Sequence, residues 1–108
     1  MYMASFMFEQ SGYDEAFYAL DQVIQKVADR MDGFMGRESW QSADGKRKNA
    51  VYYWRDLESL TAFARDEKHQ QAKQQYKKWY DGFQVVIAKV EHTYGDGQFD
   101  HLLAQPDH

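Results

Sequence analysis

Apolar residues recur at steps of three and four between Phe17 and Met31, and polar residues fill the positions between them. The apolar positions are Phe17, Leu20, Ile24, Val27 and Met31. This spacing predicts an amphipathic helix with one buried face. Ser11 and Asp14 have the spacing of a capping box before it. Asp32-Gly33 is a stop signal, because glycine accepts the left-handed backbone that closes a helix.

Four other segments are rich in aromatic, β-branched and methionine residues and are bounded by turn residues, which is the pattern of β-strands. They are Tyr2–Glu9, Phe34–Gln41, Lys48–Trp54 and Phe83–Tyr94. The stretch Ser42–Gly45 ends in Asp-Gly, a strong hairpin signal. We therefore expect the second and third strands to form a hairpin.

A second helical region is predicted between the third and fourth strands. Asp56 is a candidate N-cap for a helix from Leu57 to about Arg65, and a further helix runs from about Lys68 to Tyr80. Lysines and glutamines form its wet face. The residues expected to face inward are Ala72, Tyr76, Trp79 and Tyr80.

The order strand, helix, strand, strand, helix, strand predicts a ferredoxin-like α+β domain, β-α-β-β-α-β. Right-handed crossovers fold this order into one four-stranded antiparallel sheet with both helices on the same face. We expect this domain to cover residues 1–95 and a C-terminal tail to cover 96–108, either as a loose arm or packed on a partner subunit.

The strands are apolar on both faces, although an antiparallel sheet with one wet face alternates apolar and polar residues. In the fourth strand, Val86 and Ala88 alternate with Val85 and Ile87. Two helices cover only one face. We therefore expect a homodimer, in which two sheets pack face to face as a dimeric α+β barrel.

Charge, cysteine content and hydropathy narrow the possible partners, chemistry and location of the protein. The net charge of −4 gives no electrostatic reason to expect nucleic acid or an anionic membrane as a partner. There is no cysteine, which excludes disulfides, thiolate catalysis and Cys-ligated metal centres. No apolar stretch approaches the roughly 18 residues of a membrane span. No signal-peptide pattern begins the chain, so we expect a cytoplasmic protein.

Several runs of this sequence resemble the antibiotic biosynthesis monooxygenase family. They are Gly33–Ser39, Tyr52–Leu60, His69 followed by Ala72, and Trp79-Tyr80 before Lys89-Val90-Glu91. The resemblance extends from Tyr2 to Tyr94 and implies a dimeric α+β barrel. The family includes cofactor-independent oxygenases acting on polyphenols or quinols, haem-degrading enzymes, and proteins of no known activity.

The haem-degrading branch uses an Asn on the first strand, and a Trp and a His in the second helical region. Alignment from Trp54 puts Phe63 at the Trp position and Lys73 at the His position. The first strand contains no Asn, and His69 lies one helical turn before the expected His. The chain therefore departs from the haem-degrading pattern, and we keep haem degradation only as an alternative function.

His69 is the candidate catalytic residue. The resemblance places it at the mouth of a cleft between helices and sheet, where an imidazole takes a proton from a phenolic substrate. Histidine has an ordinary pKa of about 6.5, which suits proton transfer near neutrality. The alternative is that His69 caps or bridges the break between the two helical pieces.

The aromatic residues Trp54, Tyr53, Trp40 and Trp79 are the candidate substrate-binding residues. Stacking on these rings suits a flat quinol, and the alternative is that they pack the core and the dimer interface. Glu91 and His92 point to opposite faces of a strand and do not chelate one ion, so no metal site is predicted.

The leading hypothesis is a cofactor-independent monooxygenase that oxidises a small aromatic or quinol-like molecule, with no metal or flavin. One alternative is a non-catalytic dimeric protein, stress-related or binding a small molecule, and another is a haem-binding or haem-degrading monooxygenase. Cofactor-free oxygenation requires one base, a hydrogen-bond donor such as a Tyr or Trp, and a dry cavity for the substrate anion.

Overall fold

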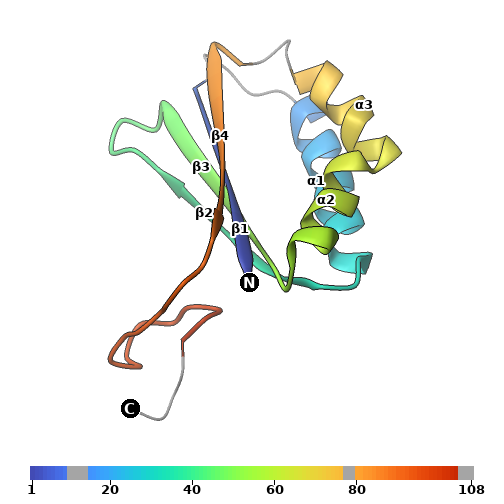
Figure 1. The fold of residues 1–108 in the computed structure, drawn as a ribbon. Helices are drawn as coiled ribbons and strands as arrows, with labels where there is room; N and C mark the ends of the chain where they lie inside the picture. The colour runs from blue at the N-terminus through green and yellow to red at the C-terminus, as the bar shows by residue number, and fades with distance from the viewer. Residues whose placement is uncertain (10–14, 77–79, 105–108) are drawn as a thin grey trace.

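Four antiparallel strands form one sheet in the order β2-β3-β1-β4. The computed structural model describes residues 1–9, 15–76 and 80–104 of the chain (Figure 1). The strands are β1 (Tyr2–Glu9), β2 (Phe34–Gln41), β3 (Arg47–Trp54) and β4 (Gly82–Lys89). The helices are α1 (Glu15–Arg30), α2 (Leu57–Arg65) and α3 (Glu67–Tyr76). All three lie on one face of the sheet, so the predicted ferredoxin-like α+β fold is confirmed.

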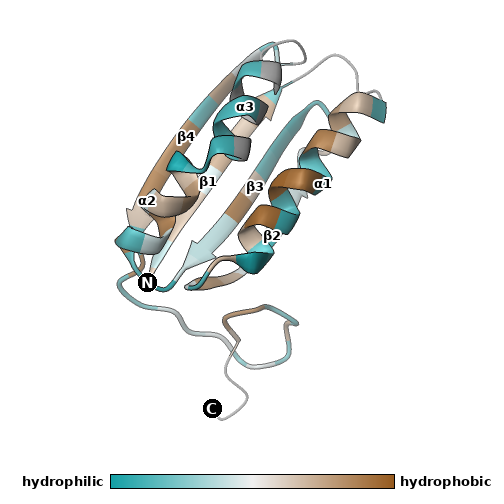
Figure 2. Ribbon diagram, turned by 90° about the vertical axis from the view of Figure 1, so that its right-hand side faces the viewer, coloured by the Kyte–Doolittle hydropathy of each residue, from teal (hydrophilic) through white to brown (hydrophobic). Residues whose placement is uncertain are grey.

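The predicted stripe of α1 is its buried face. Phe17 and Ile24 are buried, and Leu20, Val27 and Met31 pack against the same core. The residues of α3 that are coloured in Figure 2 are hydrophilic. The capping pair Ser11 and Asp14 and the aromatic residue Trp79 lie outside the described residues.

The sheet has a helix-side face and a helix-free face. Tyr2, Ala4, Phe6 and Phe8 of β1 pack on the core under the helices, and the alternate residues Met3, Ser5 and Met7 point the other way. The strand register carries this alternation to the other strands. On β3, therefore, Tyr52 and Trp54 face the helices, and Val51 and Tyr53 face away.

Asp56 is the N-cap of α2, as predicted. Its Oδ1 accepts the Ser59 N–H at 2.8 Å, and this bond is the main cause that lowers the pKa of the Asp56 carboxyl. The next helix starts one residue after α2's cap residue Asp66. The Asp66 Oδ1 accepts the backbone N–H of His69 at 3.2 Å, which satisfies a donor in the first turn of α3.

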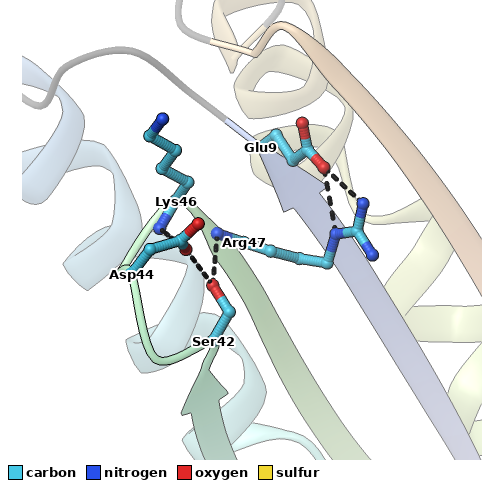
Figure 3. Close-up of polar contacts among 5 residues, drawn as sticks. All are labelled: Glu9, Ser42, Asp44, Lys46 and Arg47. Atoms are coloured by element: carbon cyan, nitrogen blue, oxygen red, sulfur yellow. Dashed lines mark hydrogen bonds and ion pairs between the residues drawn. The ribbon is translucent and has the colours of Figure 1, made fainter.

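The hairpin between β2 and β3 turns at Ser42–Gly45 (Figure 3). Asp44 Oδ1 accepts the Ser42 hydroxyl at 2.6 Å and the Lys46 N–H at 3.0 Å, and Gly45 has a φ of +74°. On the neighbouring strand, Glu9 accepts the Arg47 Nε at 3.0 Å, in direct register across β1 and β3. These contacts fix the hairpin and its register.

The last strand is shorter than predicted. The ladder ends at Lys89, not at Tyr94, because the neighbouring strand β1 begins at Tyr2. One more bond follows, from the Val90 N–H to the Met1 carbonyl at 2.9 Å. Beyond it the chain continues past the sheet as the C-terminal segment, which we define as residues 91–104 (Figure 1). Leu102 of this segment lies against Gly36 of β2.

The helices leave β4 uncovered. The α1 helix packs on β2, and α2 packs on β1 and β3. As a result β4 exposes apolar side chains on both of its faces, namely Phe83, Val85, Val86 and Ile87. No helix in the part of the chain that the structure describes is long and apolar enough to cross a membrane.

Candidate functional site

An aromatic cluster fills the space between β3 and the helical layer. We call it the helix-side cluster and define it as Phe34, Tyr52, Trp54, Phe63 and His69. The Trp54 ring lies 5.0 Å from the rings of Phe34 and Phe63, and the Tyr52 ring lies 5.6 Å from Phe63. The strands supply three of these rings, and α2 and α3 supply the other two.

Trp54 is the most deeply buried large side chain of the described residues, with an exposed fraction of 0%. Its indole Nε1–H is also buried and has no hydrogen-bond acceptor among the residues that the structure describes. A buried donor without a partner costs roughly 1–3 kcal/mol relative to a paired one. The fold therefore holds a hydrogen-bond donor inside an aromatic environment.

His69 lies in the first turn of α3, next to the break between the two helices. Its ring stacks on Phe63 with centroids 4.4 Å apart and an interplanar angle of 22°. Phe63 thus contacts both His69 and the β3 rings of Tyr52 and Trp54. Both predicted roles, proton acceptor and packing at the helix break, are compatible with this position.

The sequence did not single out Phe63 as a site residue, although it occupies the position where haem-degrading relatives have a Trp. That correspondence was the one available signal. Tyr52 was likewise not chosen. Burial, followed by the negative charge of Asp21, raises the pKa of Tyr52 to about 12, so this phenol stays protonated in the cluster at neutral pH.

Tyr53 and Trp40 lie on the helix-free face, away from His69 and Trp54. The Tyr53 hydroxyl donates to Glu38 Oε1 at 2.8 Å, and Glu38 Oε2 lies 2.8 Å from His101 Nε2. Burial and then the Glu38 hydrogen bond raise the pKa of Tyr53 to about 12. Trp40 is exposed beside the C-terminal segment.

The structure therefore divides the predicted aromatic wall between two sites. Consecutive residues of a strand point to opposite faces, so Tyr53 and Trp54 cannot line the same side of the sheet. Of the four predicted binding residues, only Trp54 lies in the same cluster as His69. Tyr53 and Trp40 lie on the other face of the sheet, and Trp79 lies outside the described residues. Among the described residues, no group of three His, Asp or Glu side chains is arranged to hold a metal ion.

Several solved structures share this fold. SnoaB, a cofactor-independent oxygenase from Streptomyces nogalater, matches with a TM-score of 0.73 and 11% identity over 85% of this chain and 94% of its own. Rv0793 from Mycobacterium tuberculosis matches with a TM-score of 0.75 and 14% identity over 87% and 98%. At these identities the likeness is one of fold, and it defines the class as the ferredoxin-like α+β proteins.

The sequence comparisons assign the family. The model of the monooxygenase af470-like family matches residues 4–96. YqjZ of Bacillus subtilis is 33% identical over 82 residues, which cover 75% of this chain and 68% of YqjZ. The chain belongs to the monooxygenase af470-like family, and the expected resemblance in fold to antibiotic biosynthesis monooxygenases is confirmed.

Proposed function

We propose that this protein is a monooxygenase that oxidises an electron-rich aromatic molecule of the quinol type at the helix-side cluster, without a metal or flavin. The observation that carries the proposal is the buried Trp54 N–H, which lacks an acceptor among the described residues and is surrounded by aromatic rings. An oxygen atom on a flat aromatic substrate supplies the missing acceptor, and the rings supply stacking surface.

His69 is the proposed general base. It takes the proton of a phenolic hydroxyl, and the resulting anion donates one electron to dioxygen. The two radicals combine to form a carbon–oxygen bond, and the His69 imidazolium returns its proton to the peroxide. The resulting hydroperoxide loses water together with the hydrogen on its carbon, which leaves a C=O group. One oxygen atom stays on the ring carbon, the other leaves in water, and the substrate supplies all four electrons. The Trp54 N–H holds the substrate oxygen while its negative charge delocalises.

Access to Trp54 requires a movement of Phe63. The Phe63 ring contacts His69 and the β3 aromatics. When Phe63 turns aside, the substrate ring takes the place of Phe63 in the aromatic stack. Such a movement also brings the substrate hydroxyl next to the imidazole. Phe63 is then the gate of the proposed site. Because the substrate fills the space that the Phe63 ring leaves, water stays excluded from the site.

The proposed assembly is a homodimer in which the two sheets pack face to face as a dimeric α+β barrel, so that a second copy covers β4. This edge strand exposes four apolar side chains on two faces, and an exposed apolar edge in a small soluble domain is typical of a surface that pairs with another chain. The expected symmetry is a two-fold axis, which repeats the same contact on both subunits.

Oxygen consumption tests the function. A set of anthrone- and naphthoquinol-type substrates is incubated with the wild-type protein, His69→Ala and the control His92→Ala, whose histidine is exposed and lies outside the cluster. We expect uptake by the wild type and His92→Ala, and a loss of about 100-fold or more in His69→Ala, the usual contribution of a general base.

Two results would contradict the proposal. Equal uptake by all three proteins removes His69 from the mechanism. A substrate-induced rise in melting temperature with no oxygen uptake above the buffer rate, for every substrate, indicates a non-catalytic binding protein. Circular dichroism of each variant confirms that the fold is retained.

A further inference from the structure

The sheet ends in two edge strands, β2 on one side and β4 on the other. Among the described residues, no strand pairs with the outer side of either. An edge strand presents backbone N–H and C=O groups that are a template for pairing with another chain. Soluble proteins block such edges with charged residues, proline, β-bulges or a covering segment. The two edges of this sheet differ in these features.

The β2 edge is blocked in three ways. Its pairing with β3 shifts register between Phe34 and Gly36, which is the irregularity of a β-bulge. The charged residues Arg37 and Glu38 follow in the middle of the strand. Leu102 of the C-terminal segment lies against Gly36 and covers this part of the edge. We therefore expect β2 to stay unpaired.

The β4 edge lacks these features. Between Phe83 and Ala88 the strand contains no charged residue, no proline and no glycine. Its register with β1 continues without a shift from Gly82 to Lys89. The exposed apolar side chains of this strand are Phe83, Val85, Val86 and Ile87. Two copies of β4 meet without like-charge repulsion along this stretch, so the strand is an unprotected apolar edge.

The register also determines which backbone groups lie on the free side of β4. The Val90 N–H donates to the Met1 carbonyl at 2.9 Å, and successive residues of an antiparallel strand direct their N–H and C=O groups to alternate edges. Gln84, Val86 and Ala88 therefore direct these groups towards β1. The residues that direct them outwards are Phe83, Val85, Ile87 and Lys89. A row of hydrogen-bond donors and acceptors thus lines the outer edge of β4.

We propose that the outer edge of β4 pairs through its backbone with a strand of a second copy of this chain. This inference rests on the homodimer proposed above. Face-to-face packing brings the second copy to β4, and hydrogen bonds along the edge then close the seam between the two sheets, because a closed barrel has no free edge there. A second copy suits this edge because two-fold symmetry repeats the contact and leaves neither β4 open to further chains.

Amide hydrogen exchange of the full chain tests this pairing, and the same strand supplies the control. The outward amides of Val85 and Ile87 report on the second copy, and the inward amides of Gln84 and Ala88 report on β1. In the dimer we expect both pairs to exchange about 100-fold or more slowly than in an unstructured peptide. In Val86→Glu, which should be monomeric, the outward amides should lose this protection and the inward amides should keep it.

A proline substitution removes one outward donor. Val85→Pro loses the N–H that points to the second copy, whereas the matched variant Val85→Ala also loses the valine side chain but keeps the N–H. Sedimentation should give Val85→Pro a dimer dissociation constant about ten-fold or more above that of Val85→Ala, because each copy loses a hydrogen bond across the contact. Circular dichroism checks the fold of both variants, and the exchange experiment decides alone where the proline variant does not fold.

The possible results separate the backbone pairing from the dimer on which it rests. A dimer whose outward amides exchange as in an unstructured peptide would overturn the pairing and leave face-to-face packing in place. Equal dissociation constants of folded Val85→Pro and Val85→Ala would do the same. Outward amides that stay protected in monomeric Val86→Glu would show that the chain covers its own edge, which also overturns the pairing. A wild-type monomer would remove both the pairing and the homodimer.

Discussion

Tyr52 and Tyr53 are neighbours in the chain, yet each belongs to a different site. Tyr52 packs with Phe63 under the helices, and Tyr53 donates to Glu38 on the other face. Strand alternation made this division predictable from the sequence. The Glu38–His101 contact was not predictable, since it joins β2 to a tail with no periodic pattern. Nor was the stacking of His69 on Phe63, which depends on the angle at the helix break.

The two buried phenols predict a pH dependence. Burial raises the pKa of both Tyr52 and Tyr53 to about 12, so the unfolded chain ionises first. Stability should therefore be intact below about pH 10, the ordinary pKa of tyrosine, and should fall as the pH rises towards 12. An ultraviolet titration of phenolate should show a late step near pH 12 that becomes smaller in Tyr53→Phe. A single common step for all tyrosines would contradict this.

At the scale of the elements, the turns determine how helices and strands meet. Gly33 ends α1 with a φ of +89°, and a Cβ placed there would lie 2.1 Å from the Ser59 Oγ at the start of α2. Gly45 in the hairpin has a similar φ of +74°, but a Cβ there meets nothing within 4 Å. A comparison of substitutions at the two glycines therefore distinguishes the effect of backbone strain from that of steric overlap.

Replacing each glycine by alanine should give different losses of stability. Gly45→Ala bears only the left-handed strain and should lower the free energy of unfolding by about 1–2 kcal/mol. Gly33→Ala adds the overlap with Ser59 and should lose a further 1–3 kcal/mol, roughly the cost of overpacking. Urea denaturation of both variants measures the difference. Equal losses would mean that the α1–β2 turn and α2 are not packed as described.

The boundaries of most elements followed from local sequence. The apolar steps of α1, the Asp56 cap and the Asp44-Gly45 turn each have a local cause. The length of β4 did not follow, because the apolar alternation continues to Tyr94 while the partner strand stops. The hydrogen-bonded length of β4 depends on the length of its partner β1, and strand pairing is a tertiary property that the local sequence does not contain.

At the scale of the whole molecule, the uncovered strand β4 is the main anomaly of a lone protomer. We expect sedimentation equilibrium to give about twice the chain mass of 12.8 kDa. Val86→Glu puts a charge on the helix-free face of the exposed apolar strand and should shift the protein to the monomer. Val23→Glu, at an exposed apolar position of α1, is the control and should remain dimeric. A wild-type monomer at working concentration would remove the proposed assembly.

The central claim is that a quinol-type molecule binds beside Trp54. The indole N–H resonances of the tryptophans report on this directly, in a titration with a quinol under nitrogen so that no turnover occurs. We predict that the Trp54 resonance, assigned through Trp54→Phe, moves downfield and saturates as its N–H gains an acceptor. A Trp54 resonance that stays in place while the Trp40 resonance moves would show that the molecule binds elsewhere.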